Sequence, residues 1–214
     1  VGEFQVPTGA EQTIDLIKLM IAKGVKFEDR LPAQLLDRDA RFTPPPPKIT
    51  DVALIRAARS SDIEAMRALI DGGADPSMRD DKRGGVTPLV AVMMGPELPS
   101  LIEADRRPLE DEAIRALDFL LGRGVSPTIA NDLGTTAMHL AALRDYPAVI
   151  RYLAEKGVNL NVADKEGFTP LDYAQGHAHS KMRFVKPPPS ETAAAAELRK
   201  LGAQGKGEQR TAAR

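Results

Sequence analysis

The chain has 214 residues, with 29 basic and 30 acidic side chains and a formal net charge of −1 at pH 7. A protein that binds nucleic acid through bulk electrostatics needs an excess of basic residues, so this balance argues against that class. The absence of cysteine excludes disulfide bonds, thiolate metal sites, iron–sulfur clusters and thiol nucleophiles, and no apolar run approaches the roughly 20 residues that span a bilayer.

Near the N-terminus, one helix is expected without its partner. Residues 12–21 place four apolar side chains on one face of a helix and are followed by Gly24. An amphipathic helix alone leaves its apolar face uncovered, so we expect residues 1–29 to be a truncated repeat that keeps only its second helix, with more repeats upstream. Residues 30–50, with consecutive prolines at 44–47, are expected to be a proline-rich insertion.

Beyond residue 50, short alanine-rich helices alternate with more amphipathic ones. Residues 52–58 and 137–142 are small and alanine-rich. The partner segments carry wider apolar stripes at helical spacing. These stripes are Ile63, Met66, Leu69 and Ile70; Ile114, Leu117, Leu120 and Leu121; and Tyr146, Val149, Ile150 and Leu153. The alternation predicts a series of helical hairpins.

Residues that favour helix ends flank these segments. Asp62 is placed to cap one second helix, and Pro147 suits the first turn of another. Gly73, Gly124 and Gly157 follow their apolar runs, where a residue with positive φ is favoured. Where a segment begins Thr-Pro-Leu, the threonine can cap the first helix. These residues set the expected helix boundaries.

The hairpins repeat along the chain with a fixed period. Gly157–Asp164 has the pattern of Gly124–Asn131 at an offset of 33 residues. Thr169 and Thr136, which begin two of the first helices, are also 33 residues apart. Earlier copies are displaced by about 50 residues, as expected for a repeat that carries an insertion.

The period, the helix lengths and the punctuating residues together resemble the ankyrin repeat. The residues that carry the resemblance are Gly73-Ala-Asp75, Thr87-Pro-Leu89, Thr136-Ala-Met-His139, Ala141-Ala142 and Gly167-Phe-Thr-Pro-Leu171. The resemblance covers about residues 10–202. It implies an all-α fold, a helix-turn-helix repeat solenoid with hairpin-tip loops between repeats, and a non-catalytic function in binding other proteins.

On this resemblance, residues 51–202 contain four repeats. They are expected at about 51–80, 81–131, 132–163 and 164–202, with insertions at about 95–112 and 176–190. The polar residues 203–214 are expected to be a disordered tail.

Three residues depart from the family pattern in the first helices. Ala137 stands where the family has proline, and Val90 and Asp172 stand where it has histidine. Residues 52–55 also lack the Thr-Pro start. We therefore expect these first helices to be less regular.

The histidines are the main candidates for chemistry. His139 occupies the Thr-x-x-His position, where the resemblance implies hydrogen bonding between repeats, and no nucleophile stands beside it. His177 and His179 could share a cation from an extended loop, with Asp172 the only obvious carboxylate nearby, but two ligands make a weak site. The acidic residues within 103–112 are interleaved with arginine and fit a solvated surface. We predict no catalytic residue, no cofactor and no metal site.

The resemblance places recognition on the hairpin tips and on the exposed side of the first helices. Carried over residue by residue, it predicts a partner-binding site formed by Arg59, Ser60, Arg79, Lys82, Arg83, Val86, Met94, Asp132, Leu133, Thr135, Leu143, Arg144, Lys165, Glu166 and Phe168. Met94, Leu133, Leu143 and Phe168 are expected to be exposed anchors, and Phe168 fits equally well as a cover for a neighbouring repeat. Mixed charge with apolar anchors favours a protein or peptide partner and predicts no nucleic acid, no membrane insertion and a monomer.

Two functions remain open on the sequence. The first is a non-catalytic scaffold that binds a protein or peptide on the concave face of the repeats. The second is the targeting or regulatory arm of a larger enzyme, whose catalytic domain lies outside this chain. The truncated first repeat motivates the second function.

Overall fold

The computed structural model describes residue 19 and residues 49–95, 110–180 and 192–208. Within these ranges the chain forms helices and two isolated β-bridges, and no strand. The helices are α2 (Ile49–Arg59), α3 (Ile63–Asp71), the 3₁₀ helix η2 (Asp81–Arg83), α4 (Pro88–Met94), α5 (Glu110–Gly122), α6 (Ala137–Leu143), α7 (Pro147–Glu155), α8 (Pro170–Ala174) and α9 (Ala193–Lys200). None of these helices has the length and apolar character needed to cross a bilayer.

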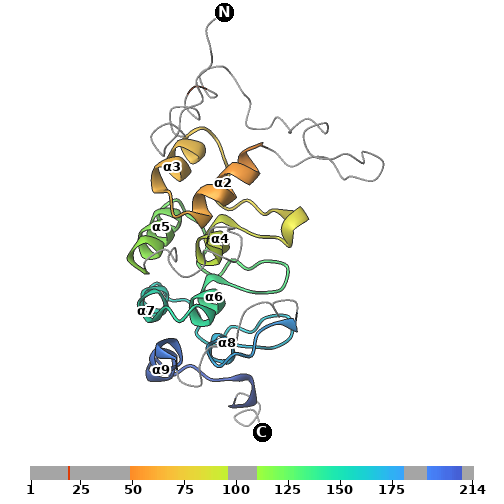
Figure 1. Cartoon of the computed structure of the whole chain (residues 1–214), viewed down its shortest axis with the longest axis vertical. Helices are drawn as coiled ribbons and strands as arrows, with labels where there is room; N and C mark the ends of the chain where they lie inside the picture. The colour runs from red at the N-terminus through yellow and green to blue at the C-terminus, as the bar shows by residue number, and fades with distance from the viewer. Residues whose placement is uncertain (1–18, 20–48, 96–109, 181–191, 209–214) are drawn as a thin grey trace, which may run out of the picture.

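Four helix pairs stack along one axis (Figure 1). Helices α2, α4, α6 and α8 form an inner row, and α3, α5, α7 and α9 form an outer row beside it. Each helix contacts its partner in the pair and the corresponding helix of the next pair. The predicted all-α repeat solenoid is therefore confirmed.

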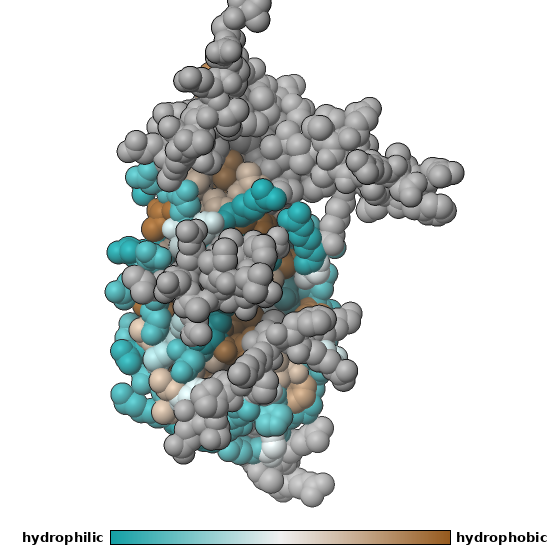
Figure 2. Space-filling view, in the orientation of Figure 1, coloured by the Kyte–Doolittle hydropathy of each residue, from teal (hydrophilic) through white to brown (hydrophobic). Residues whose placement is uncertain are grey.

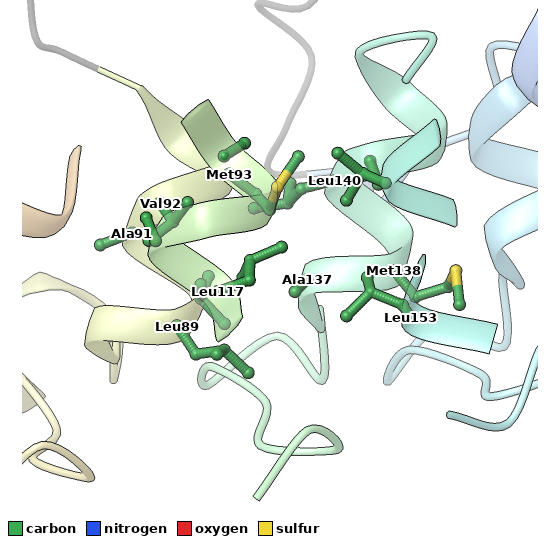
Figure 3. Packing of buried hydrophobic residues seen from close by; sticks show 14 of the residues in the cluster. Leu89, Ala91, Val92, Met93, Leu117, Ala137, Met138, Leu140 and Leu153 are labelled. Carbon is green, nitrogen blue, oxygen red and sulfur yellow. The ribbon is translucent and has the colours of Figure 1, made fainter. Parts of the chain in front are cut away.

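The inner helices are short because neighbours cover them on several sides. Every residue of α4 from Pro88 to Met93 is buried, and so is every residue of α6 from Ala137 to Ala142. Alanine side chains keep these helices thin, so that adjacent helices approach closely. Figure 3 shows part of this packing, in which apolar side chains of α4, α5 and α6 fill the space between the helices.

The outer helices bury one face only. In α7, Val149, Ile150 and Leu153 are buried, as the apolar stripe predicts. In α3, Met66 and Leu69 are buried, and the other two members of the predicted stripe are half-buried. The exposed faces of these helices carry the polar residues.

The predicted helix ends are confirmed. The Asp62 carboxylate accepts a hydrogen bond from the N–H of Ala65 at 2.9 Å, and Pro147 is the first residue of α7. Gly73 and Gly157 adopt φ values of 102° and 80° after their helices.

The turn between inner and outer helix differs between units. In units one and three it is tight and contains a non-glycine residue with positive φ, Ser61 at 53° and Asp145 at 59°. In units two and four, residues 96–109 and 181–191 intervene, and they lie outside the described residues. Residues 110–112, counted with the insertion on the sequence, instead form the first turn of α5. Apart from residue 19 and α2, which begins at Ile49, the expected truncated repeat (1–29) and insertion (30–50) also lie outside the description.

Part of the expected disordered tail packs on unit four, which corrects that prediction. Ala203 is buried, and the N–H of Gln204 donates to Oδ1 of Asn161 at 2.7 Å. The Lys206 N–H donates to the Asp172 carboxylate at 3.0 Å. The polar composition suggested disorder, but Gly202-Ala-Gln204 repeats the turn pattern of Gly157-Val-Asn159 and folds like it. Residues 209–214 lie outside the described residues.

Candidate functional site

Each of two successive hairpin tips is closed by one side chain. Oδ1 of Asn131 accepts hydrogen bonds from two backbone N–H groups of its own tip, at 2.9 and 3.0 Å. Oδ1 of Asp164 does the same in the next tip, with both distances 2.9 Å. Such side-chain to backbone bonds fix a tight turn without a strand, so the tips are rigid enough to present neighbouring side chains.

The tips also bond to one another. The N–H of Asp132 donates to the carbonyl of Gly84 at 2.8 Å, and the N–H of Lys165 donates to the carbonyl of Leu133 at 2.9 Å. Gly134, at φ 80°, permits this approach, because a Cβ there would lie 2.9 Å from the Lys165 nitrogen. The tips therefore form one continuous edge beside the inner helices (Figure 1).

Seven of the predicted partner-binding residues present side chains on this edge. Four are exposed and three are half-buried: Arg79, Arg83, Asp132 and Lys165, then Leu133, Glu166 and Phe168. Arg79 links two tips, since its Nη2 lies 2.7 Å from Oδ1 of Asp132 and its Nη1 donates to the carbonyl of Ala130 at 2.6 Å. Lys82 lies in η2, and its side chain is outside the description.

Val86 and Thr135 were predicted to contact a partner, and the structure corrects this because both are buried. Val86 is 5% exposed and belongs to the hydrophobic core, and it forms a β-bridge with Asp80. Thr135 is fully buried, and its Oγ1 lies 3.3 Å from the hydroxyl oxygen of Tyr173. Successive side chains of an extended segment point in opposite directions, so these two face inward.

The other predicted residues lie at the C-terminal ends of the inner helices. Ser60 is exposed, whereas Arg59, Met94, Leu143 and Arg144 are half-buried. Met94 and Leu143 pack partly against the core, as do Leu133 and Phe168, so the four expected anchors present only part of each side chain. The structure brings Arg59 and Arg144 together at Met94.

Lys206 is a residue of this edge that the sequence analysis missed. Its Nζ lies 4.3 Å from the centroid of the Phe168 ring and donates to the carbonyl of Glu166 at 2.5 Å. Phe168 therefore packs against a neighbouring segment while half of its environment stays open. The Gly-Ala-Gln turn at residues 202–204 was the signal that could have identified this segment.

The histidines make structural contacts. His139 is fully buried, and burial lowers its pKa. Nδ1 of His179 lies 3.5 Å from Oε1 of Glu166, and His177 is exposed. In the described ranges, no three histidine, aspartate or glutamate side chains are placed to hold a metal ion.

Two ionisable groups under the tips keep the charge states that they have at neutral pH. Burial raises the pKa of Tyr173, whose hydroxyl donates to Oδ2 of Asp164 at 2.8 Å. Hydrogen bonds from Ser180 lower the pKa of Glu166. These shifts move both groups away from the range needed for acid–base catalysis, so the contacts position the tips.

Comparisons with known proteins relate this arrangement to others. The family model of ankyrin repeats (three copies) matches residues 109–183. The chain is 27% identical over 147 residues to the mitochondrial disaggregase of Bos taurus, covering 60% of this chain and 22% of that protein. It is 24% identical over 138 residues to an ankyrin repeat protein of Fowlpox virus, with coverage of 58% and 73%. It is 28% identical over 131 residues to cyclin-dependent kinase 4 inhibitor B of Rattus norvegicus, with coverage of 61% and 86%.

Proposed function

Because the chain belongs to the ankyrin repeat family, we propose that it is a non-catalytic scaffold that binds a protein or peptide on the concave face of its repeats. Ankyrin repeats generally mediate protein–protein interaction. The rat relative is named as an inhibitor of a cyclin-dependent kinase, and so acts on another protein.

The observation that carries the proposal is the continuous edge of hairpin tips beside the inner helices. Backbone hydrogen bonds from Asp132 to Gly84 and from Lys165 to Leu133 hold the tips in line. A rigid, preformed surface loses little conformational entropy on binding, which favours affinity. On the face drawn in Figure 2, apolar surface lies between hydrophilic side chains along the stack.

The chemistry of this edge favours a polypeptide partner. Arg79 and Lys165 lie on the same edge as Asp132 and Glu166, so neither sign of charge dominates. Half-buried apolar groups such as Leu133 add contact area between the charges. A phosphate polymer would meet repulsion from the acidic tips. We accordingly propose that the chain binds as a monomer and does not bind nucleic acid.

Matched substitutions on the two sides of the stack test the proposal. The chain would be immobilised, and proteins captured from the source cells would be quantified by mass spectrometry. Leu133→Ala and Lys165→Glu, on the tips, should each reduce capture of the same proteins roughly tenfold, because about 1.4 kcal/mol of contact energy is lost. Leu121→Ala and Lys200→Glu change a half-buried leucine and an exposed lysine of the outer helices, and should leave capture unchanged.

Circular dichroism of all four variants would establish that each one is folded. The proposed function is contradicted if the outer-helix variants reduce capture as much as the tip variants, or if neither set changes it.

A second function is favoured by the lengths of the relatives. The matched stretch occupies 22% of the bovine disaggregase and 9% of the potassium channel AKT1 of Arabidopsis thaliana. The repeats would then act as the targeting or regulatory arm of a larger enzyme. The reading frame that encodes the chain distinguishes the two, because a catalytic domain in the same frame is required by the second function alone.

A further inference from the structure

Two arginines from different units converge on one residue of the unit between them. Nη2 of Arg59, at the end of α2, lies 3.7 Å from Sδ of Met94, the last residue of α4. Nη2 of Arg144, which follows α6, donates to the carbonyl oxygen of Met94. All three side chains are half-buried, so the two guanidinium groups flank Met94 and still reach the surface.

Gly95 keeps room for one of these guanidinium groups. The residue has φ 70°, and a Cβ at this position would lie 3.2 Å from both terminal nitrogens of Arg144. Any larger residue would push the guanidinium away from the end of α4. The Arg144 position is therefore built by unit two as well as by its own unit.

The charge on this part of the inner row is one-sided. Among the described side chains of α2, α4, α6 and α8, the acidic residue is Asp172, which is buried and bonded to Thr169. Arg56 and Arg59 are the basic ones, and Arg144 follows α6. Asp145, next to Arg144, is engaged elsewhere, since its Oδ1 accepts from the N–H of Ala194 at 2.7 Å.

Building on the proposed function, we propose that the partner is an acidic peptide segment whose carboxylates bind at Arg59 and Arg144. A guanidinium group offers several donors in a fixed plane and binds carboxylates in pairs of parallel hydrogen bonds. One Arg144 donor is used by the Met94 carbonyl, and the group carries others. An apolar side chain of the same segment would lie on Met94 and Leu143, which present part of their surface beside the arginines.

Peptide display on the full chain tests this proposal. A random peptide library would be selected against the wild-type chain and against Arg59→Glu, and the recovered sequences compared with the unselected library. The wild-type chain should enrich peptides rich in aspartate and glutamate, and their affinity should fall as salt rises. Arg59→Glu should shift the selection toward lysine and arginine, a reversal that loss of stability cannot produce.

Two further variants sharpen the measurement. Arg144→Lys keeps the charge but loses the planar fork, so binding of the selected acidic peptides should weaken roughly tenfold. Arg115→Glu introduces the same charge reversal at an exposed position of the outer helix α5 and should change nothing. Circular dichroism would verify the fold of each variant.

The outcomes separate the acidic partner from the broader function. If the selected peptides depend on Leu133 and Lys165 but carry no excess of acid, the acidic partner is wrong and the concave-face function survives. If no selected peptide responds to any inner-row or tip substitution, the concave-face function itself is contradicted. A single-stranded oligonucleotide that displaces the selected peptides more strongly than free glutamate-rich peptide would also overturn the acidic partner.

Discussion

His139 joins two repeats through both of its ring nitrogens. The backbone N–H of Thr136 donates to Nδ1 at 3.2 Å, so Nδ1 is an acceptor and the proton lies on Nε2. Nε2 then donates to the carbonyl of Phe168 in the next unit at 3.1 Å. The ring also packs edge-on against Tyr173, with the centroids 4.8 Å apart. The neutral imidazole is thus the form that the structure stabilises.

This geometry predicts a dependence of stability on pH. Burial lowers the pKa of His139 below its ordinary value of 6.5. The unfolded chain therefore binds a proton more readily than the folded chain, so this contribution is complete above pH 6.5 and is lost as the pH falls below that value. Urea unfolding at about pH 7.5 and about pH 5.5 should show a decrease that is smaller in His139→Gln than in the wild type, by at most about 1 kcal/mol.

His177→Gln is the matched control, because His177 is exposed. This control should lose stability with pH as the wild type does. The assignment of a neutral, buried His139 is contradicted if His139→Gln and the wild type lose the same free energy of unfolding.

The sequence predicted the role of His139, but not that of its counterpart. Asp172 stands 33 residues after His139, where the family pattern has histidine. Its Oδ2 accepts from the N–H of Thr169 at 2.7 Å, which reproduces the contact that Nδ1 of His139 makes with Thr136. Its short side chain cannot reach a following tip. Instead, the segment at Lys206 approaches the carboxylate, and a spacing rule that uses only the histidine pattern cannot reveal this.

At the scale of elements, acids from one unit cap the outer helices of the next. Oε2 of Glu110, at the start of α5, accepts from the N–H of Ala148 at 2.6 Å and from that of Val149 at 3.3 Å. These two N–H groups lie in the first turn of α7, whose own N-cap residue, Tyr146, contributes no side-chain hydrogen bond. A carboxylate at this end also interacts favourably with the helix dipole.

Removing this cap should destabilise the stack. Glu110→Ala leaves the N-terminal N–H groups of α7 without their acceptor, and we expect a loss of about 0.5–2 kcal/mol in the free energy of unfolding. Glu110→Gln keeps an acceptor but removes the charge, so its loss should be smaller.

Asp111→Ala serves as the control for Glu110→Ala. Asp111 is an exposed neighbour in the same turn of α5, so it removes a similar charge from that helix without touching α7. Equal losses in Glu110→Ala and Asp111→Ala would show that the cap across units contributes nothing.

Most helices could be predicted from the sequence, and most contacts between units could not. Apolar periodicity and capping residues such as Asp62 and Pro147 are local signals, and they predicted the helices of the described units. The Glu110 cap joins residues that are 38 positions apart, and that pairing depends on the register between units. Val86 and Thr135 failed as predicted contacts for the same reason, because the direction of a tip side chain is set by the neighbouring unit.

At the scale of the whole molecule, each unit is stabilised by its neighbours. Inner helices contact inner helices and outer helices contact outer helices along the stack, so the apolar face of one pair is covered by the next. The same stacking aligns the hairpin tips into one edge. The structural arrangement that buries the core therefore also creates the surface proposed for binding.

Hydrogen exchange tests the placement of that surface most directly. Exchange of backbone amides would be measured by mass spectrometry on the full chain, alone and with the peptide selected most strongly by display. We predict slower exchange in the tips that contain Asp132 and Lys165 and at the ends of α4 and α6, with no change in the outer helices α3, α5 and α7. Protection confined to the outer helices would contradict recognition on the concave face.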